Sequence, residues 1–321
     1  MTEKVRLSEG SGGKEMQALI SEFRRRLPKG KWKNVLDDSA SIDFSGKLVF
    51  TTDSYVVTPL FFPGGDIGKI AFCGTVNDLA VMGAKPLGIS VSMVIEEGFP
   101  KKELFKIIDS VAKESKATGI PVVTGDTKVM EKGSIDKLVI NTAGIGKAER
   151  VLDEKLKEGD AIIVSGGMGE HAAALLAERF ELKSTLKTDS KPIWEEINSV
   201  RKHLKQAKDI TRGGLSAVLN ELADKNKAQI LIEEELIPVK KEVRALTEIL
   251  GIDFYPLACE GRFACVCSGK DSAAVLKKLK KFNSSASIIG EVKHGKGVIV
   301  QTKFGKKKLN APSGNIVPRI C

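Results

Sequence analysis

The sequence predicts an α/β (α+β) protein with two tandem mixed α/β domains and a flexible C-terminal tail. Three observations support this fold class. Short apolar runs and amphipathic segments alternate as far as residue 304, a polar stretch at 149–158 divides them into two series, and proline and glycine interrupt the rest. A chain of 321 residues is long enough for two domains of ordinary size. We therefore predict a first domain over 1–150, a second over 151–304 and a tail over 305–321.

The first domain is predicted to interleave helices with strands. Apolar side chains recur at helical spacing in three segments, and Pro28 and Gly119 stand where the first and the third of these should end. Shorter apolar runs between the helices predict strands. The predicted helices cover 11–27, 66–82 and 104–118, and the predicted strands cover 47–57, 86–95, 120–124 and 138–145.

The second domain shows the same mixture of elements. It opens with an apolar strand directly after Gly159 and Asp160, and an amphipathic helix follows that strand. The predicted strands cover 161–165, 229–233, 263–268, 287–292 and 298–303, and the predicted helices cover 170–180, 193–204, 214–224, 240–250 and 272–282.

Composition and charge argue against a nucleic-acid-binding, membrane or secreted protein. The net charge of +10 comes from lysines spread along the whole chain, and aromatic residues make up only 5%, so a surface for stacking bases is poorly supplied. No apolar run approaches the roughly 18 residues that cross a bilayer, and the segment MTEKVRLSEG has no signal-peptide core. Five scattered cysteines fit free thiols in a reducing compartment. We expect a cytoplasmic protein without nucleic-acid or membrane partners.

Aspartates of the first domain follow apolar strands or lie within a helix. They are Asp38, Asp53, Asp78 and Asp126, and several stand close to glycines. Magnesium prefers oxygen ligands, usually one or two carboxylates together with phosphate and water. Any one of these aspartates is explained better as a turn-capping residue, but four of them in one domain favour a Mg²⁺–phosphate site.

Two glycine-rich segments precede helices and suit the phosphate side of such a site. Gly12 and Gly13 lie before the first helix, although the spacing is not that of a Walker A loop, and Asp209 opens a similar turn, DITRGG. Lys128 follows Asp126 by two residues, which places both side chains on the same side of an extended segment. Backbone N–H groups at helix starts and a lysine ammonium both complement phosphate charge.

Other reactive side chains have simpler explanations. Glu260, in LACEGRFACV, fits either a general base or a turn residue just before a strand. Cys259, Cys265 and Cys267 lack the CxxC spacing of a zinc site, and we expect Cys265 and Cys267 to face the core as small apolar residues. We expect His171, at the start of a helix, to cap or pack.

The tail ends in Cys321. It contains helix-breaking Pro312, Gly314 and Pro318, and a fully extended arm of this length spans roughly 50 Å at about 3.3 Å per residue. Taken alone, it fits a frayed terminus or a tethered thiol that enters a site and leaves it again.

These segments together resemble the HypE family of carbamoyl dehydratases, which act in [NiFe]-hydrogenase maturation. The resemblance covers nearly the whole chain, through the segments GSGG, FTTDSYVVTPLFFPGGDIGK, CGTVNDLAVMGA, VTGDTKV, DKLVINTAG, TRGG, the EG pair before a strand, and PRIC. The ATP-handling parts are similar to a wider superfamily that includes aminoimidazole ribonucleotide synthetase, selenophosphate synthetase and thiamine-monophosphate kinase. The PRIC ending separates the HypE family from these.

The resemblance implies two domains of the aminoimidazole ribonucleotide synthetase type and an ATP- and Mg²⁺-dependent reaction. A carbamoyl group on the Cys321 thiol would be dehydrated to thiocyanate, the source of the cyanide ligand of the hydrogenase iron. The implied site residues are Asp38, Asp53, Asp126 and Asp209 for metal and phosphate, Asn77, Thr211, Gly12 and Gly13 for the nucleotide, Glu260 with Lys128 for the amide end, and Asp78 for phosphoryl positioning or proton transfer.

The resemblance also implies partners. They are a second copy of the chain, paired through the first domains, the carbamoyltransferase HypF as donor, and the HypC–HypD complex as cyanide acceptor. The chain departs from the family pattern at Glu9, Ile210, Ala172 and Cys259, and the last of these adjoins Glu260. The alternative is another ATP-dependent member of the superfamily, such as a small-molecule kinase or an amidine-forming synthetase.

Overall fold

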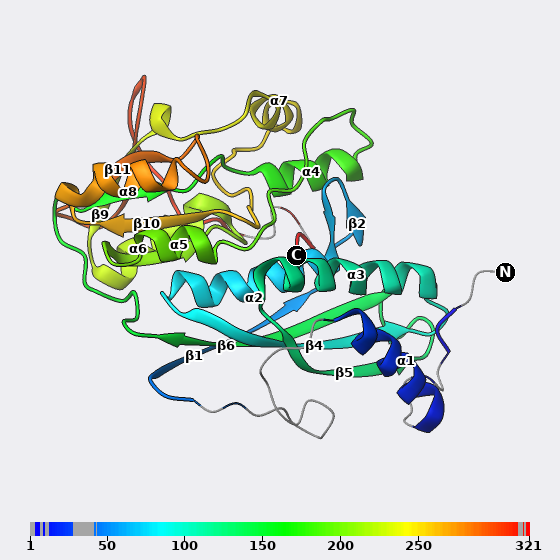
Figure 1. The fold of residues 1–321 in the computed structure, drawn as a ribbon. Coiled ribbons are helices and arrows are strands. Elements are labelled where there is room, and N and C mark those ends of the chain that lie inside the picture. Colours follow the sequence, from blue (N-terminus) through cyan, green and yellow to red (C-terminus); the bar gives the residue numbers. More distant parts are fainter. Residues whose placement is uncertain are drawn as a thin grey trace.

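The computed structural model describes residues 4–6, 9, 13–27, 42, 44–313, 317 and 319–321. It contains two α/β layers with separate sheets, one above the other in the view of Figure 1. The predicted fold class is confirmed. The predicted ligands Asp38 and Gly12 lie outside the described residues.

The first domain is built on a four-stranded sheet of order β1-β6-β4-β5. Helices α2 and α3 cover one face of this sheet (Figure 1). The two inner strands pair antiparallel, and the edge strand β5 is parallel to β4. The elements are α1 (Gly13–Arg26), β1 (Lys47–Tyr55), β2 (Phe61–Phe62), β3 (Gly65–Asp66), α2 (Ile67–Val81), β4 (Lys85–Glu96), α3 (Lys101–Thr118), β5 (Val122–Met130) and β6 (Leu138–Ala148).

Helix α2 is the central element between the two domains. Asp66 caps its N-terminus by accepting the Lys69 N–H at 3.0 Å, and nearly every side chain along it is buried. A helix that is apolar on all sides needs packing partners on all sides. Helix α3 and the sheet cover part of its surface, and strand β8 and helix α5 of the second domain cover the rest. At Gly74 an added Cβ would lie 2.2 Å from the Tyr55 hydroxyl, so only glycine permits this approach of helix to sheet.

The second domain contains a seven-stranded sheet of order β13-β12-β9-β11-β7-β10-β8. Its adjacent strands β7 and β10 are entirely buried, and the predicted core positions of Cys265 and Cys267 are confirmed, because both are 0% exposed. The elements are β7 (Ala161–Val164), α4 (Glu170–Arg179), α5 (Trp194–Val200), β8 (Leu204–Asp209), α6 (Gly214–Asn226), β9 (Gln229–Glu233), α7 (Lys241–Leu250), β10 (Phe263–Cys267), α8 (Ser272–Leu279), β11 (Ser287–Lys293), β12 (Gly297–Thr302) and β13 (Gly305–Lys308).

Two strands of this sheet were not predicted. Strand β8 occupies LKQAKD, a polar sequence with weak strand propensity, and it is extended because it pairs with β10. Strand β13 pairs antiparallel with β12. The sheet therefore extends through Lys308, into the segment predicted as the start of the tail.

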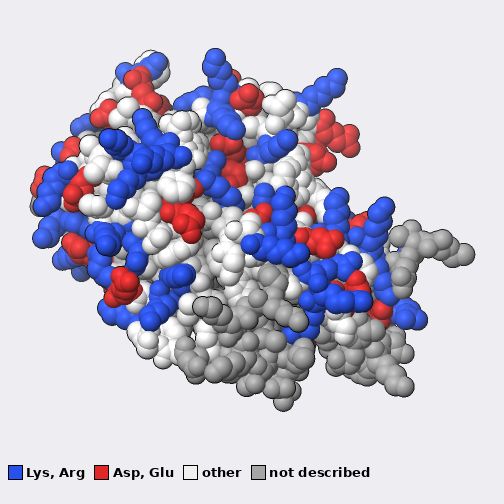
Figure 2. Space-filling view, viewed as in Figure 1, with Lys and Arg blue, Asp and Glu red and all other residues white. Residues whose placement is uncertain are grey.

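The charged surface carries both signs. Lysine and arginine side chains are interspersed with aspartate and glutamate on the face shown in Figure 2. Within the described part of the chain, no helix is long and apolar enough to cross a membrane.

Candidate active site

The end of the tail lies between the two domains (Figure 1). The Val56 N–H donates to the Cys321 carbonyl at 3.2 Å, and the Thr58 N–H donates to the Arg319 carbonyl at 3.2 Å. The tail thus pairs with the segment that leaves β1. A cavity of about 450 Å³ adjoins it, lined by Val56, Arg212, Gly213, Pro256, Ala258, Pro312, Val317, Arg319, Ile320 and Cys321.

Carboxyl groups surround the Cys321 thiol. Burial is the main reason that the pKa of this thiol is raised, and the charges of Glu260, Asp53 and Asp209 raise it further, whereas Arg212 lowers it. These side chains come from four separate elements, namely the tail, β1, the end of β8 and the loop before β10. The tertiary fold therefore places the predicted carrier thiol among predicted site carboxylates.

Asp53, Asp78 and Asp209 form the acidic side of this site. The Tyr55 hydroxyl donates to Asp53 at 3.0 Å. The Thr51 hydroxyl donates to Asp78 at 2.6 Å. Burial and then Asp53 raise the pKa of Asp78 to about 6. Burial and the charges of Asp78 and Asp53 raise the pKa of Asp209 to about 7, although its side chain is partly exposed. The raised pKa values of Asp78 and Asp209 indicate that burial and neighbouring carboxylates outweigh the positive charge near them.

Glu260 is the most deeply buried carboxyl beside the thiol. It is 2% exposed, and its buried Oε1 atom has no hydrogen-bond partner among the described residues. Burial raises its pKa well above the ordinary range, and Asp189, Asp209 and Asp53 add to the shift. Its backbone N–H donates to Asp189 Oδ1 at 3.0 Å, which fixes the main chain at this point. A buried carboxyl with a raised pKa is suited to exchanging a proton with a substrate.

The DITRGG turn brings Asp209 and Arg212 to the site. Gly213 and Gly214 have φ values of 78° and 59°, which favour glycine. A Cβ on Gly214 would also lie 2.5 Å from the Tyr255 carbonyl oxygen, so the first residue of α6 has to be glycine. Arg212 lies 3.8 Å from Asp53 and is 68% exposed at its side chain. The carbonyl of Thr211, a predicted nucleotide contact, accepts the Gly214 N–H.

Asn77 joins the two domains. Its Oδ1 accepts the Ile193 N–H at 2.9 Å, and its Nδ2 donates to the carbonyls of Lys191 and Glu260 at 3.1 and 3.3 Å. The side-chain amide of Asn77, a predicted contact of the nucleotide, is therefore already hydrogen-bonded to backbone groups of the second domain in this structure. Its amide aligns the Glu260 segment with α2.

The structure does not bring Asp126 and Lys128 to the thiol within one chain. Side chains alternate between the faces of a strand, so the register decides which of them meet. The row that contains Tyr55 faces α2, and the row that contains Asp126 faces the opposite way. That second row consists of Ser54, Asn141, Ser92 and Asp126. Lys128 shares the face of Asp126, as predicted, and both side chains are exposed.

The remaining predicted residues lie at the periphery or outside the described residues. Gly13 is the first residue of α1, which packs on α3 through Phe23 and Phe105. Among the described residues, no three His, Cys, Asp or Glu side chains are arranged to hold a metal ion by themselves. The charge of Asp53, Asp78 and Asp209 nevertheless suits a divalent cation whose other ligands are phosphate and water.

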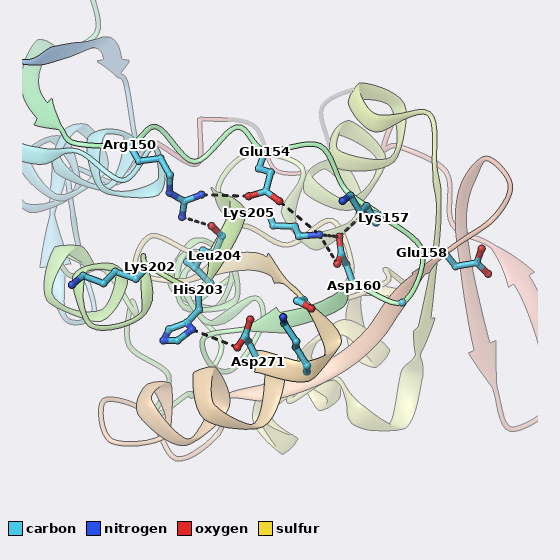
Figure 3. A pocket seen from close by; sticks show the side chains of 13 residues that line it. Arg150, Glu154, Lys157, Glu158, Asp160, Lys202, His203, Leu204, Lys205 and Asp271 are labelled. Atoms are coloured by element: carbon cyan, nitrogen blue, oxygen red, sulfur yellow. Dashed lines mark hydrogen bonds and ion pairs between the residues drawn. The ribbon is translucent and has the colours of Figure 1, made fainter.

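A second cavity lies apart from this site, at the linker between the domains. It has a volume of about 470 Å³, and none of its lining residues is a predicted site residue. Lys205 lies at its centre and reaches Asp160 at 2.7 Å and Glu154 at 4.0 Å (Figure 3). Glu154 and Asp160 in this cavity are thus paired with Arg150 and Lys205 of the same chain.

Comparison with known proteins decides the family. Residues 36–148 match the AIR synthase related protein N-terminal domain, and residues 157–303 match the corresponding C-terminal domain. The chain is 42% identical to a putative hydrogenase expression/formation protein of Methanocaldococcus jannaschii, over 99% of this chain and all of the relative. It is 38% identical to the carbamoyl dehydratase HypE of Escherichia coli, over 99% of each. The chain belongs to the carbamoyl dehydratase HypE family. The resemblance predicted from the sequence is confirmed.

Solved structures agree with this assignment. A HypE crystal structure in complex with ATP is 35% identical, with a TM-score of 0.94, and covers 98% of this chain and 99% of its own. A HypE–HypF complex is 39% identical, with a TM-score of 0.80, and covers 92% of this chain and all of the matched chain. Both domains therefore keep the family arrangement.

Several residues at this site carry no clear sequence signal. Asp189 lies in the polar segment TDSKP and resembles an ordinary turn residue. Arg212 belongs to the recognised TRGG turn, but only the fold places it against Asp53. His171 was expected to cap or pack, and it packs edge-on against Phe62 at 5.4 Å. It also contacts the tail, which its sequence position does not indicate.

Proposed function

We propose that the chain is an ATP-dependent carbamoyl dehydratase that converts a carbamoyl group on Cys321 to thiocyanate. The observation that carries this proposal is the placement of the Cys321 thiol beside Glu260, Asp53 and Asp209 in a chain of the HypE family. The product would supply the cyanide ligand for the iron of a [NiFe]-hydrogenase.

The chemistry explains why a buried acid stands beside the thiol. Dehydration of S–C(=O)–NH₂ requires the oxygen to leave, and oxide is a poor leaving group. Transfer of the ATP γ-phosphoryl group to that oxygen lets it depart as phosphate, while the two nitrogen protons are removed to leave S–C≡N. Glu260 is placed to accept a nitrogen proton, since burial strengthens its ionised carboxylate as a base.

ATP and Mg²⁺ fit the acidic side of the site. Asp53, Asp78 and Asp209 would hold the cation, which supplies charge neutralisation to the phosphates. The cation would also stabilise the ionised carboxylates of Asp78 and Asp209, whose pKa values are raised by burial and by the charges of neighbouring carboxylates. The exposed Arg212 lies at the mouth of the site, where a phosphate would meet it.

A homodimer would supply the residues that one chain does not bring to the site. Asp126 and Lys128 share the outer sheet face with Phe50, 65% exposed, and Leu48, 57% exposed. Pairing of two first domains through the edge strand β1 would cover these apolar side chains. It would direct the partner subunit's Asp126 and Lys128 towards the nucleotide and the amide.

Analytical sedimentation of the wild-type chain should show a dimer, and the Phe50→Glu variant should sediment as a monomer. A monomeric wild type would contradict this assembly.

The partners and location follow from the same proposal. A HypE relative is solved as a HypE–HypF complex, so HypF is proposed as the carbamoyl donor. The HypC–HypD complex is proposed as the cyanide acceptor, and the protein is expected in the cytoplasm with its partners.

The decisive experiment needs no partner protein. The chain is carbamoylated with cyanate, Mg-ATP is added, and the mass of the C-terminal peptide is followed beside a Cys321→Ala control, because cyanate also modifies lysines. Loss of one water from the Cys321 carbamoyl group, dependent on ATP, is expected. If the carbamoyl group persists while ATP still binds, the tail is not the substrate, and soluble phosphate acceptors become the substrates to test.

A further inference from the structure

The last residues of the tail are held by side chains of the second domain as well as by the β1 segment. Arg179, on α4, donates to the carbonyls of Thr58 and Arg319 at 2.6 Å each. About two turns earlier on the same helix, His171 Nε2 lies 3.0 Å from the Ile320 carbonyl oxygen. Helix α4 therefore holds the backbone of Ile320, the residue before Cys321, through His171.

The hydrogen-bond partners of His171 define its tautomer. The Ile320 carbonyl only accepts, so Nε2 must carry the proton and donate it. His171 is fully buried, and burial lowers its pKa to about 4, so the ring is neutral and Nδ1 is an acceptor. Nδ1 lies 2.8 Å from the Thr188 hydroxyl, which must be the donor. That hydroxyl in turn accepts the Ser190 N–H at 3.1 Å.

The segment that fixes His171 also fixes Glu260. Thr188 and Ser190 flank Asp189, whose Oδ1 accepts the Glu260 N–H at 3.0 Å. The Thr188 N–H donates to the Pro63 carbonyl of the first domain at 2.8 Å, which anchors the segment to both domains. Residues 188–190, here called the clamp segment, thus connect the proposed base with the carbonyl next to the thiol.

We infer that His171 is a positioning residue for the tail, and that the clamp segment sets the distance between Cys321 and Glu260 through it. The donor on Nε2 is directed at the backbone of residue 320, so it acts on any tail sequence that docks there. The docking of the tail by His171 does not rest on the proposed function, whereas the effect of that docking on the rate of dehydration does.

Cysteine alkylation measures docking directly. Cys73, Cys259, Cys265 and Cys267 are each 0% exposed, whereas Cys321 is only partly buried. Iodoacetamide labelling of the full chain is followed by the mass of the C-terminal peptide. His171→Phe keeps the ring against Phe62 but removes the donor, and we expect labelling about tenfold faster, as for loss of one buried hydrogen bond. His171→Gln restores a donor and should label at close to the wild-type rate.

A matched histidine controls for general loosening. His203, paired with Asp271 at the linker cavity, is replaced by Phe in the same assay and should leave labelling unchanged. Equal acceleration by both variants, or a wild-type rate in a folded His171→Phe protein, overturns the inference. If His171→Phe does not fold, Thr188→Val tests the same chain of bonds, with labelling about threefold faster expected and an unchanged rate contradicting the clamp.

A single-turnover measurement connects docking with chemistry. In the carbamoylated chain, His171→Phe should slow the ATP-dependent loss of water about tenfold, while the thermal shift caused by Mg-ATP is unchanged. If His171→Phe labels faster than the wild type but the wild type itself shows no dehydration, the proposed function is refuted and the role of the clamp segment stands. Normal dehydration and normal labelling in His171→Phe would refute the clamp alone.

Discussion

Two regions of the molecule bury a carboxyl group to nearly the same degree, yet treat it in opposite ways. Asp160, at the linker, is 3% exposed, and Glu260, at the tail site, is 2% exposed. Asp160 accepts two bonds from Lys205 at 2.7 and 2.8 Å and a third from the Lys157 N–H at 2.7 Å. Glu260 has one carboxyl oxygen with no hydrogen-bond partner in the part of the chain that the structure describes.

The difference separates a structural carboxylate from a reactive one. Burying a charge is costly unless a partner of opposite charge and hydrogen bonds offset the loss of water. At the linker the chain supplies those partners itself. At the tail site the neighbours of Glu260 are mainly further acids, and the exposed Arg212 offsets them only in part, so the site favours a bound cation.

The largest expected effect lies at the tail site. Glu260→Gln should lower the rate of ATP-dependent dehydration about 10³-fold, because the amide cannot accept a proton. Asp160→Asn should leave that rate unchanged at a temperature where the variant is folded. Single-turnover mass spectrometry of the carbamoylated tail measures both, and equal losses would erase the distinction between the two carboxyls.

The same two substitutions should have opposite effects on stability. Asp160→Asn leaves Lys205 partly buried beside a weaker partner, and we expect the free energy of unfolding to fall by about 3 kcal/mol. Glu260→Gln removes an acid whose pKa is raised in the folded state, so the free energy of unfolding at pH 8 should rise by about 2 kcal/mol. Denaturant titrations at pH 8 without nucleotide test this, and two losses would contradict it.

The acidic side of the site predicts a pH dependence. The folded-state pKa values of Asp78 and Asp209 are raised to about 6 and about 7. The folded chain therefore holds protons that the unfolded chain releases, and stability is lost as pH rises from about 4 to 7. Asp209→Asn should reduce that loss by roughly 2 kcal/mol in the absence of divalent cations. A slope identical to that of the wild type would show that the pKa of Asp209 is not raised in the folded chain.

The smallest expected effect is at the surface end of the tail. Asp136 pairs with Arg319, and that hydrogen bond lowers the pKa of the Asp136 carboxyl. Both side chains are largely exposed, so Asp136→Asn should destabilise tail docking by only about 0.5 kcal/mol. Iodoacetamide labelling of Cys321 should therefore accelerate about twofold, and this increase should disappear at high salt. A large acceleration would mean that this pair, rather than His171, holds the tail.

The sequence by itself predicted helices and strands with clear local patterns, including the amphipathic α3 and the continuously apolar α2 and β7, since those patterns depend only on neighbouring residues. It also suggested candidate site residues in recognisable segments, such as Asp53 in FTTDSY and Glu260 before β10, and their roles remain predictions. The sequence did not predict strand β8, because the polar segment LKQAKD is extended only through its pairing with β10.

The tertiary structure decided which of these residues meet. Asp53 and Asp126 each follow strand patterns of the same kind, but the register of β1, β6, β4 and β5 directs them to opposite faces of the sheet. His171 and the Ile320 carbonyl are far apart along the chain, and no local pattern joins them. The sequence specifies the chemistry of each side chain. The distances between side chains on different elements follow from the packing of the two sheets around α2, and that packing depends on the whole fold.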